Sequence, residues 1–384
     1  MRSNMTTRSY TNARIITEND VISGHLVVRD GVIAEIDHGP CPLHDAHDCG
    51  GDYLAPGLVE LHTDNLEGHL QPRPGVHWPK AAAVLAHDSE LAGVGITTVF
   101  DALRVGSILS ERVHGYDSYA RDVADEIKLL SKAERLKISH MIHLRAEICS
   151  ETLVDEINQF GPDDAVRIIS MMDHTPGQRQ FRDISKFRQY LQGKQGMSTE
   201  AVEAHFEKLF DLQKENGAKH TQIIIDHANK LGARLASHDD ATDEDVGNSI
   251  KAGATIAEFP TTIEAAQHCR EANQAIIMGA PNLIRGGSHS GNVAARTLAE
   301  QGLLDIISSD YVPAALLMSA WKLANIIDDL AGAIATVTHN PAKAAGLVDR
   351  GLLTPGLRAD LIRFGVVSDT PQVREVLVAG RRVA

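Results

Sequence analysis

Eight short apolar runs recur along the middle of this 384-residue chain, and each ends in polar residues. Most are too short for helices, and they lack the strict alternation of a half-buried strand. Short continuous apolar runs of this kind are typical of strands buried in a parallel sheet. Helical patterns separate several of them. Eight strands alternating with helices over about 270 residues predict an α/β fold, a (β/α)8 barrel. The runs are Gly57–Asn65, Ile96–Asp101, Ile138–Glu147, Val166–His174, Arg234–His238, Thr255–Pro260, Ala275–Ala280 and Leu304–Asp310.

The helical patterns between these runs also have definite bounds. They are Ala81–Ala92, Tyr119–Arg135, Glu200–Gly217, Ile223–Leu231, Ile263–Ala272 and Asn292–Glu300. The stretch 175–231 is longer than one connecting helix needs, so we expect a helical insertion there, either a solvated hairpin or a lid over the barrel.

Both ends of the chain carry short alternating strands separated by turn signals such as Asp30-Gly31 and Pro355-Gly356. Chain termini often lie close together, so the two ends are expected to pair. The sequence therefore predicts a composite small β-sandwich domain from residues 1–55 and 345–384, and a metal-dependent barrel from residues 56–344.

Composition narrows the functions that this chain could have. The formal net charge is −14, which disfavours binding to nucleic acid and to anionic membranes. The four cysteines show no two-residue spacing of a thiolate metal site, which is typical of a reduced, intracellular protein. The first twenty residues lack the apolar stretch of a signal peptide, so the expected location is the cytoplasm.

A histidine and a carboxylate end the first predicted barrel strand. His62 and Asp64 are two residues apart, so they lie on the same face of the strand. At the carboxyl end of a barrel strand they would point into the mouth of the barrel, where active sites of this fold are built. One imidazole and one carboxylate offer nitrogen and oxygen ligands to a divalent cation.

Further strand ends carry the same residue types: Glu147, His174, His238 and Asp310. Carboxylates that converge in one mouth repel each other and need a cation. Six ligands suit two divalent ions, Zn²⁺ or Mn²⁺, better than one. We expect His62, Asp64 and Asp310 to hold one ion, His174 and His238 to hold the other, and Glu147 to bridge them. His238 and Asp310 are the expected catalytic residues, with Asp310 accepting a proton from the attacking water.

This ordered set resembles the amidohydrolase superfamily. Pro56–His62 is similar to the motif of that superfamily's first strand, and Gly351–Leu361 to its closing motif. The resemblance implies a barrel with a small β-sandwich and a metal-activated water. Asp64 stands where most members have a second histidine, and Glu147 would replace their carboxylated lysine.

Longer segments resemble the branch of the superfamily that acts in phosphonate metabolism. They are His62–Glu67, Pro72–Pro74, His77–Pro79, Met172–Gln180, Ser237–Thr242, Ala257–Thr262, Met278–Asn282 and Arg285–Asn292. What this resemblance implies is hydrolysis of alpha-D-ribose 1-methylphosphonate 5-triphosphate to the 5-phosphate and pyrophosphate.

An acidic protein needs local donors for so anionic a small-molecule substrate. The segment 285–292 combines a guanidinium, glycines and hydroxyls before a helix expected to begin near Asn292, which favours anion binding. The substrate-binding candidates are Asn65, Arg73, Arg179, Arg285, Ser288 and His289.

Two other functions fit the same pattern. A cyclic amide hydrolase of the dihydroorotase or hydantoinase kind would direct the same water at a carbonyl carbon, because a fold does not decide a function. A non-catalytic scaffold is the other, and the presence of every expected ligand argues against it. The sequence leaves the metal, the phosphorus attacked and the oligomeric state open, a homo-oligomer included.

Overall fold

The structure is a computed structural model that describes residues 7–107, 118–177, 179, 184–195, 197–288 and 291–384. Its centre is a sheet of eight parallel strands whose neighbours follow the order of the chain. The predicted barrel is confirmed, and the apolar run Arg234–His238 coincides with a strand. The strands are β6 (Leu58–Thr63), β7 (Ile96–Val105), β8 (Ser139–Glu147), β9 (Val166–Met172), β10 (Arg234–His238), β11 (Ile256–Glu258), β12 (Ala275–Gly279) and β13 (Ile306–Ser308).

Side chains close the barrel between its first and last strands. Thr63 and Asp310 form a parallel bridge, and the Thr63 hydroxyl donates to the Asp310 carbonyl at 2.7 Å. The fully buried Glu60 carboxylate accepts from the Ser308 hydroxyl and from the Ser309 backbone N–H, both at 2.6 Å. Burial raises the pKa of Glu60. These bonds fix β6 against β13, so the ends of the two strands open into one mouth.

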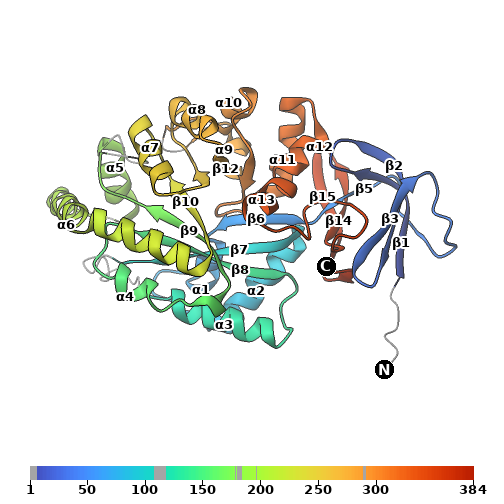
Figure 1. Ribbon diagram of the computed structural model, residues 1–384, viewed down its shortest axis with the longest axis horizontal. Helices are drawn as coiled ribbons and strands as arrows, with labels where there is room; N and C mark the ends of the chain where they lie inside the picture. Colours follow the sequence, from blue (N-terminus) through green and yellow to red (C-terminus); the bar gives the residue numbers. More distant parts are fainter. Residues whose placement is uncertain (1–6, 108–117, 178, 180–183, 196, 289–290) are drawn as a thin grey trace.

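Helices cover the outside of the barrel (Figure 1). Leucine, isoleucine and alanine side chains fill the layer between strands and helices, while a separate cluster that includes Phe100 and Ile168 fills the interior of the barrel. The helices are α1 (Asn65–Leu70), α2 (Lys80–Gly93), α3 (Ala120–Lys132), α4 (Leu153–Ile157), the 3₁₀ helix η2 (Pro162–Asp164), α5 (Ile184–Gln195), α6 (Thr199–Leu231), α7 (Asp243–Lys251), α8 (Ile263–Glu271), α9 (Ala280–Arg285), α10 (Ala295–Glu300), α11 (Ala315–Ile327), α12 (Leu330–Ala335) and α13 (His339–Ala344).

A second sheet joins both ends of the chain, as expected. Its order is β16-β15-β14-β5-β1-β2-β3, with β4 beside β1. The link between the two ends is the antiparallel pairing of β5 with β14, in which Pro56 faces Leu361. The strands are β1 (Thr7–Ile16), β2 (Val21–Arg29), β3 (Val32–His38), β4 (His47–Asp48), β5 (Tyr53–Pro56), β14 (Leu361–Val367), β15 (Thr370–Val378) and β16 (Arg381–Arg382).

The long segment before β10 differs from the sequence expectation. We expected two helices, 200–217 and 223–231, but α6 runs unbroken for 33 residues. Gly217 lies inside it, where a glycine costs about 1 kcal/mol relative to alanine, and the buried His220 ring meets the Ile148 carbonyl at 2.8 Å just beyond. This contact and the apolar cluster between α5 and α6 keep the helix continuous.

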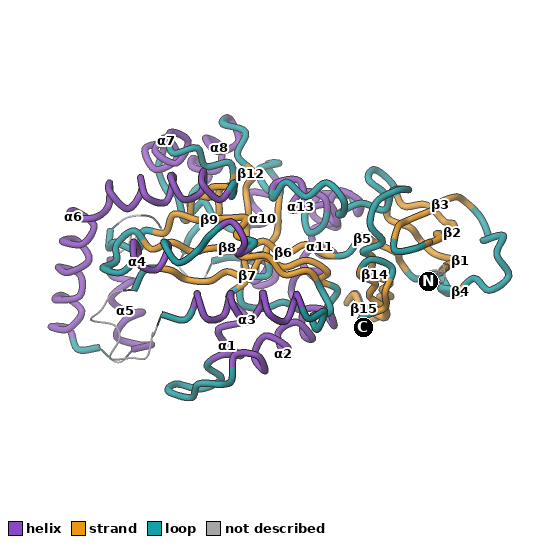
Figure 2. The backbone as a smooth tube through the Cα atoms, turned by 60° about the horizontal axis from the view of Figure 1, so that its bottom comes forward, coloured by secondary structure: helices purple, strands orange, loops and turns teal. Residues whose placement is uncertain are grey.

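Helices α5 and α6 lie at the end of the molecule opposite the terminal sheet (Figures 1 and 2). Among the described helices, none combines the length and the apolar character that a bilayer-crossing segment requires.

Candidate active site

Backbone strain marks the carboxyl ends of several barrel strands. Asp239 follows β10 and Phe259 follows β11, with φ angles of 56° and 55°, and Asp310 follows β13 with a φ of 56°. Residues other than glycine adopt this left-handed region at a cost, and such strain gathers at functional sites. The turns direct the neighbouring side chains into the mouth of the barrel.

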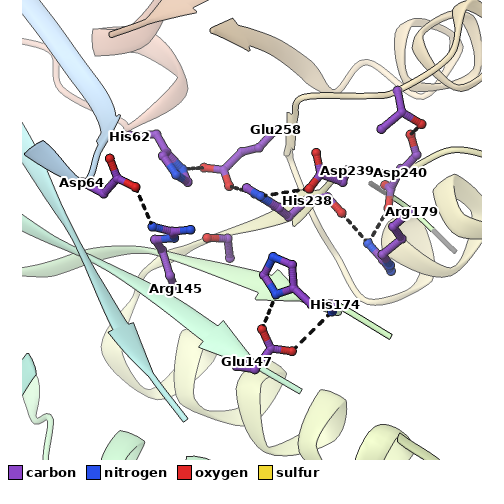
Figure 3. A network of polar contacts seen from close by, with 12 residues as sticks. His62, Asp64, Arg145, Glu147, His174, Arg179, His238, Asp239, Asp240 and Glu258 are labelled. Carbon is purple, nitrogen blue, oxygen red and sulfur yellow. Dashed lines mark hydrogen bonds and ion pairs between the residues drawn. The ribbon is translucent and has the colours of Figure 1, made fainter. Parts of the chain in front are cut away.

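One carboxylate joins two histidines at the centre of this mouth (Figure 3). Glu258, at the end of β11, is 1% exposed. Its Oε1 accepts from His62 Nδ1 at 3.1 Å and its Oε2 accepts from His238 Nδ1 at 3.0 Å. The two imidazoles stack, with ring centroids 5.5 Å apart. Among the described residues, these three offer ligand atoms within 4.8 Å of one another, close enough to hold a cation.

The pairing with Glu258 also sets the proton on each ring. An imidazole that donates its Nδ1–H to a carboxylate leaves a lone pair on Nε2, and metal-binding histidines are commonly oriented in this way. The arrangement therefore fits two imidazoles that each present Nε2 as a cation ligand, with Glu258 behind them. His238 Nε2 lies 3.2 Å from an Asp239 carboxylate oxygen, so further oxygen ligands are at hand.

The environment of His238 favours positive charge. Burial alone would lower the pKa of this imidazole, but the Asp239 and Glu258 carboxylates raise the pKa to about 9. The pKa of Asp310 is raised, first by burial and then by the nearby charge of Asp64. A buried cluster of this composition binds either protons or a metal cation.

A second pair lies beside the first on neighbouring strand ends. His174 Nδ1 contacts a Glu147 carboxylate oxygen, and the rings of His174 and His238 are 6.4 Å apart. Glu147 is buried, while the His174 side chain is 31% exposed. The remaining predicted ligand on the first strand, Asp64, accepts from Arg145 Nη1 at 3.3 Å. The structure thus brings the six predicted ligands to one end of the barrel; their division between two ions stays a prediction.

Two of the predicted substrate-binding residues make strong contacts with the protein itself. Arg179 donates to the His238 carbonyl at 2.6 Å and to Asp240 Oδ1 at 2.8 Å, so its guanidinium lies beside the site but also supports β10. The Asn65 amide donates to Glu90 Oε2 at 2.9 Å. Both side chains are partly buried.

Of the other candidates, Arg73 lies in a loop, Arg285 is the last residue of α9 and Ser288 follows that helix. Arg73 and Arg285 are exposed, Ser288 is partly buried, and His289 lies outside the described residues. The helix expected near Asn292 begins at Ala295 instead. The reason is Asn282, whose side chain accepts from the Ala295 N–H at 2.9 Å and donates to the Val293 carbonyl at 3.2 Å. These bonds hold the segment in a non-helical conformation.

Sequence reasoning missed Glu258 and Arg145 as site residues. Both stand at or near the end of an apolar run, which is the signal used for the other ligands. Glu258 closes a strand of three residues, and its histidine partner His62 is 196 residues away in the chain. Nothing in the sequence indicated that pairing.

Known structures share this architecture over almost the whole chain. An amidohydrolase aligns with a TM-score of 0.57 at 14% identity, covering 98% of each chain. N-isopropylammelide isopropylaminohydrolase from Burkholderia multivorans gives 0.63 at 16% identity and also covers 98% of each chain. N-acetyl-D-glucosamine-6-phosphate deacetylase from Mycobacterium smegmatis gives 0.63 at 16%, covering 98% of this chain and 100% of its own. At such identities the likeness shows the fold alone.

The barrel with its terminal sheet is the fold of these amidohydrolase structures, and its mouth holds a cluster of histidine and carboxylate side chains that could bind a cation. No family model matches the sequence. A curated protein from Escherichia coli (strain K12), alpha-D-ribose 1-methylphosphonate 5-triphosphate diphosphatase, is 39% identical over 378 residues, covering 97% of this chain and 99% of its own. The chain therefore belongs to the family of that diphosphatase.

Proposed function

We propose that this protein hydrolyses alpha-D-ribose 1-methylphosphonate 5-triphosphate to the 5-phosphate and pyrophosphate. The observation that carries the proposal is the 39% identity to the Escherichia coli diphosphatase over nearly the full length of both proteins. In this reaction the anhydride bond between the α and β phosphorus atoms breaks. The oxygen of water joins the α phosphorus, and pyrophosphate leaves.

The donor set suits two divalent ions, and Zn²⁺ and Mn²⁺ both accept mixed histidine and carboxylate ligands. His62, Asp64 and Asp310 would hold one ion, His174 and His238 the other, with Glu147 between them. When bound, such ions lower the pKa of a coordinated water and neutralise charge on phosphate oxygens. The pairing of Glu258 with His62 and His238 supports the role of both imidazoles as ligands, because it orients each ring through Nδ1.

The protein's own groups supply the remaining chemistry. We assign Asp310 the role of accepting a proton from the attacking water; its location in the mouth with Asp64, His62 and His238 supports this role. Arg179, Asn65, Arg73, Arg285, Ser288 and His289 are the proposed contacts to the anionic substrate, since guanidinium groups bind phosphate oxygens in pairs. The proposed boundaries are a barrel of residues 56–344 and a composite domain of residues 1–55 and 345–384.

Turnover of the ribose triphosphate by a His238→Ala variant tests the proposal. The expected result is loss of pyrophosphate release, while His268→Ala, at a half-exposed ion pair on α8, keeps the wild-type rate. Wild-type protein should leave dihydroorotate and hydantoin intact. Ring opening of these amides without triphosphate cleavage would overturn the proposal.

A further inference from the structure

Strand β8 carries a guanidinium into the mouth of the barrel. Leu144 and Ala146 pack in the outer apolar layer, so the alternate residues of β8 face the opposite way. His143 meets the Leu61 carbonyl in the interior at 2.8 Å, Arg145 reaches Asp64, and Glu147 reaches His174. Arg145 therefore lies between the floor of the site and its rim.

The hydrogen-bonding capacity of the Arg145 guanidinium is not fully satisfied by the protein groups that the structure describes. An arginine has five N–H donors. The bond from Nη1 to Asp64 is long, at 3.3 Å, and within the described part of the chain the buried Nε–H meets no acceptor. Arg350, which is buried, bonds to Asp349, Thr98 and Ser139. A buried donor without a partner costs about 1–3 kcal/mol, so Arg145 is a site where an additional acceptor would be stabilised.

Neighbouring carboxylates stabilise the positive charge of the Arg145 guanidinium. Burial opposes its positive charge, but Asp64 and then Glu67 raise its pKa further above the usual range, and Asp310 adds to the effect. The same Asp64 is a proposed ligand of a divalent ion. A doubly charged ion at Asp64 would weaken the attraction that holds the guanidinium there, because it would neutralise the carboxylate and repel the arginine.

We infer that Arg145 is an anion-binding residue that is released by the cation: without metal its guanidinium neutralises Asp64, and when a divalent ion takes Asp64 the guanidinium binds phosphate oxygens of the substrate. This inference rests on the proposed function. It assigns the triphosphate a contact inside the mouth of the barrel. Arg73, in a loop, and Arg285, at the end of α9, are exposed instead. It also makes metal loading and anion binding favour each other.

The test compares Arg145→Gln and Arg145→Lys with wild type and with Arg296→Gln, which removes only an exposed ion pair to Glu300. Isothermal titration of metal-free protein with Mn²⁺ gives cation affinity, and titration of the loaded protein with pyrophosphate gives anion affinity. We expect Arg145→Gln to bind Mn²⁺ more tightly than wild type, because the competing charge is gone. Its affinity for pyrophosphate should fall about tenfold or more. Arg145→Lys should lie between the two.

If Arg145 had only a structural role, its replacement would weaken the affinities for both Mn²⁺ and pyrophosphate. The opposite changes expected here therefore distinguish a binding role from a structural one. Unchanged pyrophosphate affinity in a folded Arg145→Gln variant would overturn the inference, and so would weaker Mn²⁺ binding. If wild-type protein instead fails to cleave the ribose triphosphate, the proposed function fails. Pyrophosphate binding would still report on Arg145 in that case.

Discussion

Replacing Glu258 with glutamine probes the centre of the site with almost no change in shape. The carboxylate accepts from two imidazoles, at 3.1 Å from His62 and 3.0 Å from His238. An amide has one accepting oxygen and one donating nitrogen. Glu258→Gln therefore preserves one of these bonds at most, and the other histidine must change its tautomer or lose its partner.

The expected size of the effect follows from one lost bond. A hydrogen bond to a charged group contributes about 1.5–3 kcal/mol, and loss of a partner that orients a metal ligand typically lowers metal affinity about 10- to 100-fold. We expect Glu258→Gln to weaken Mn²⁺ binding to this extent in isothermal titration of metal-free protein. Activity should recover partly when Mn²⁺ is raised.

The matched control is Glu156→Gln. Glu156 is also buried, but its carboxylate bonds to the Gly106 N–H and the Ser107 and Thr152 hydroxyls. That variant should lose stability without losing Mn²⁺ affinity. Wild-type cation affinity and rate in Glu258→Gln would refute the orienting role, and a loss far beyond a hundredfold would assign Glu258 as a direct ligand.

Three further experiments address other parts of the structure. Asp310→Asn should lower kcat about 10²- to 10⁴-fold without lowering the melting temperature, because it removes a charge that burial and Asp64 disfavour; an unchanged kcat would argue against a proton-accepting role. Dialysis against a chelator should abolish pyrophosphate release and lower the melting temperature by ligand linkage, and added Zn²⁺ or Mn²⁺ should restore both; full activity after verified metal removal would contradict metal dependence. Burial opposes protonation of His140, but Asp101 raises its pKa to about 9 from 6.5, so this stabilisation is complete below pH 6.5 and is lost as pH rises through 9. His140→Gln should therefore cost about 3 kcal/mol in urea unfolding at pH 6 and clearly less at pH 10, whereas an equal cost at both pH values would refute this explanation.

The architecture could be predicted from the sequence because each strand carries its own signal. Apolar runs of five to ten residues between polar ends indicate buried parallel strands, whatever they pair with. The prediction of the helices in the insertion was less accurate. The pattern predicted separate helices at 200–217 and 223–231, but burial of His220 and the apolar cluster between α5 and α6 keep α6 continuous.

The site was predicted where strand order alone brings residues together. His62 and His238 end parallel strands of one barrel, so their proximity follows from the fold. The roles of Glu258 and Arg145 depend on which atoms face each other across strands distant in the chain, and no local pattern encodes this. The start of α10 was missed for the same reason, because it depends on the distant Asn282 side chain.

Phosphorus NMR of the reaction in ¹⁸O-enriched water, with alpha-D-ribose 1-methylphosphonate 5-triphosphate as substrate, shows both which bond is cleaved and which phosphorus takes up the oxygen of water. We expect equal amounts of pyrophosphate and the 5-phosphate, with the ¹⁸O isotope shift on the 5-phosphate. Release of orthophosphate with a remaining 5-diphosphate, or an intact triphosphate in the presence of metal-loaded protein, would contradict it.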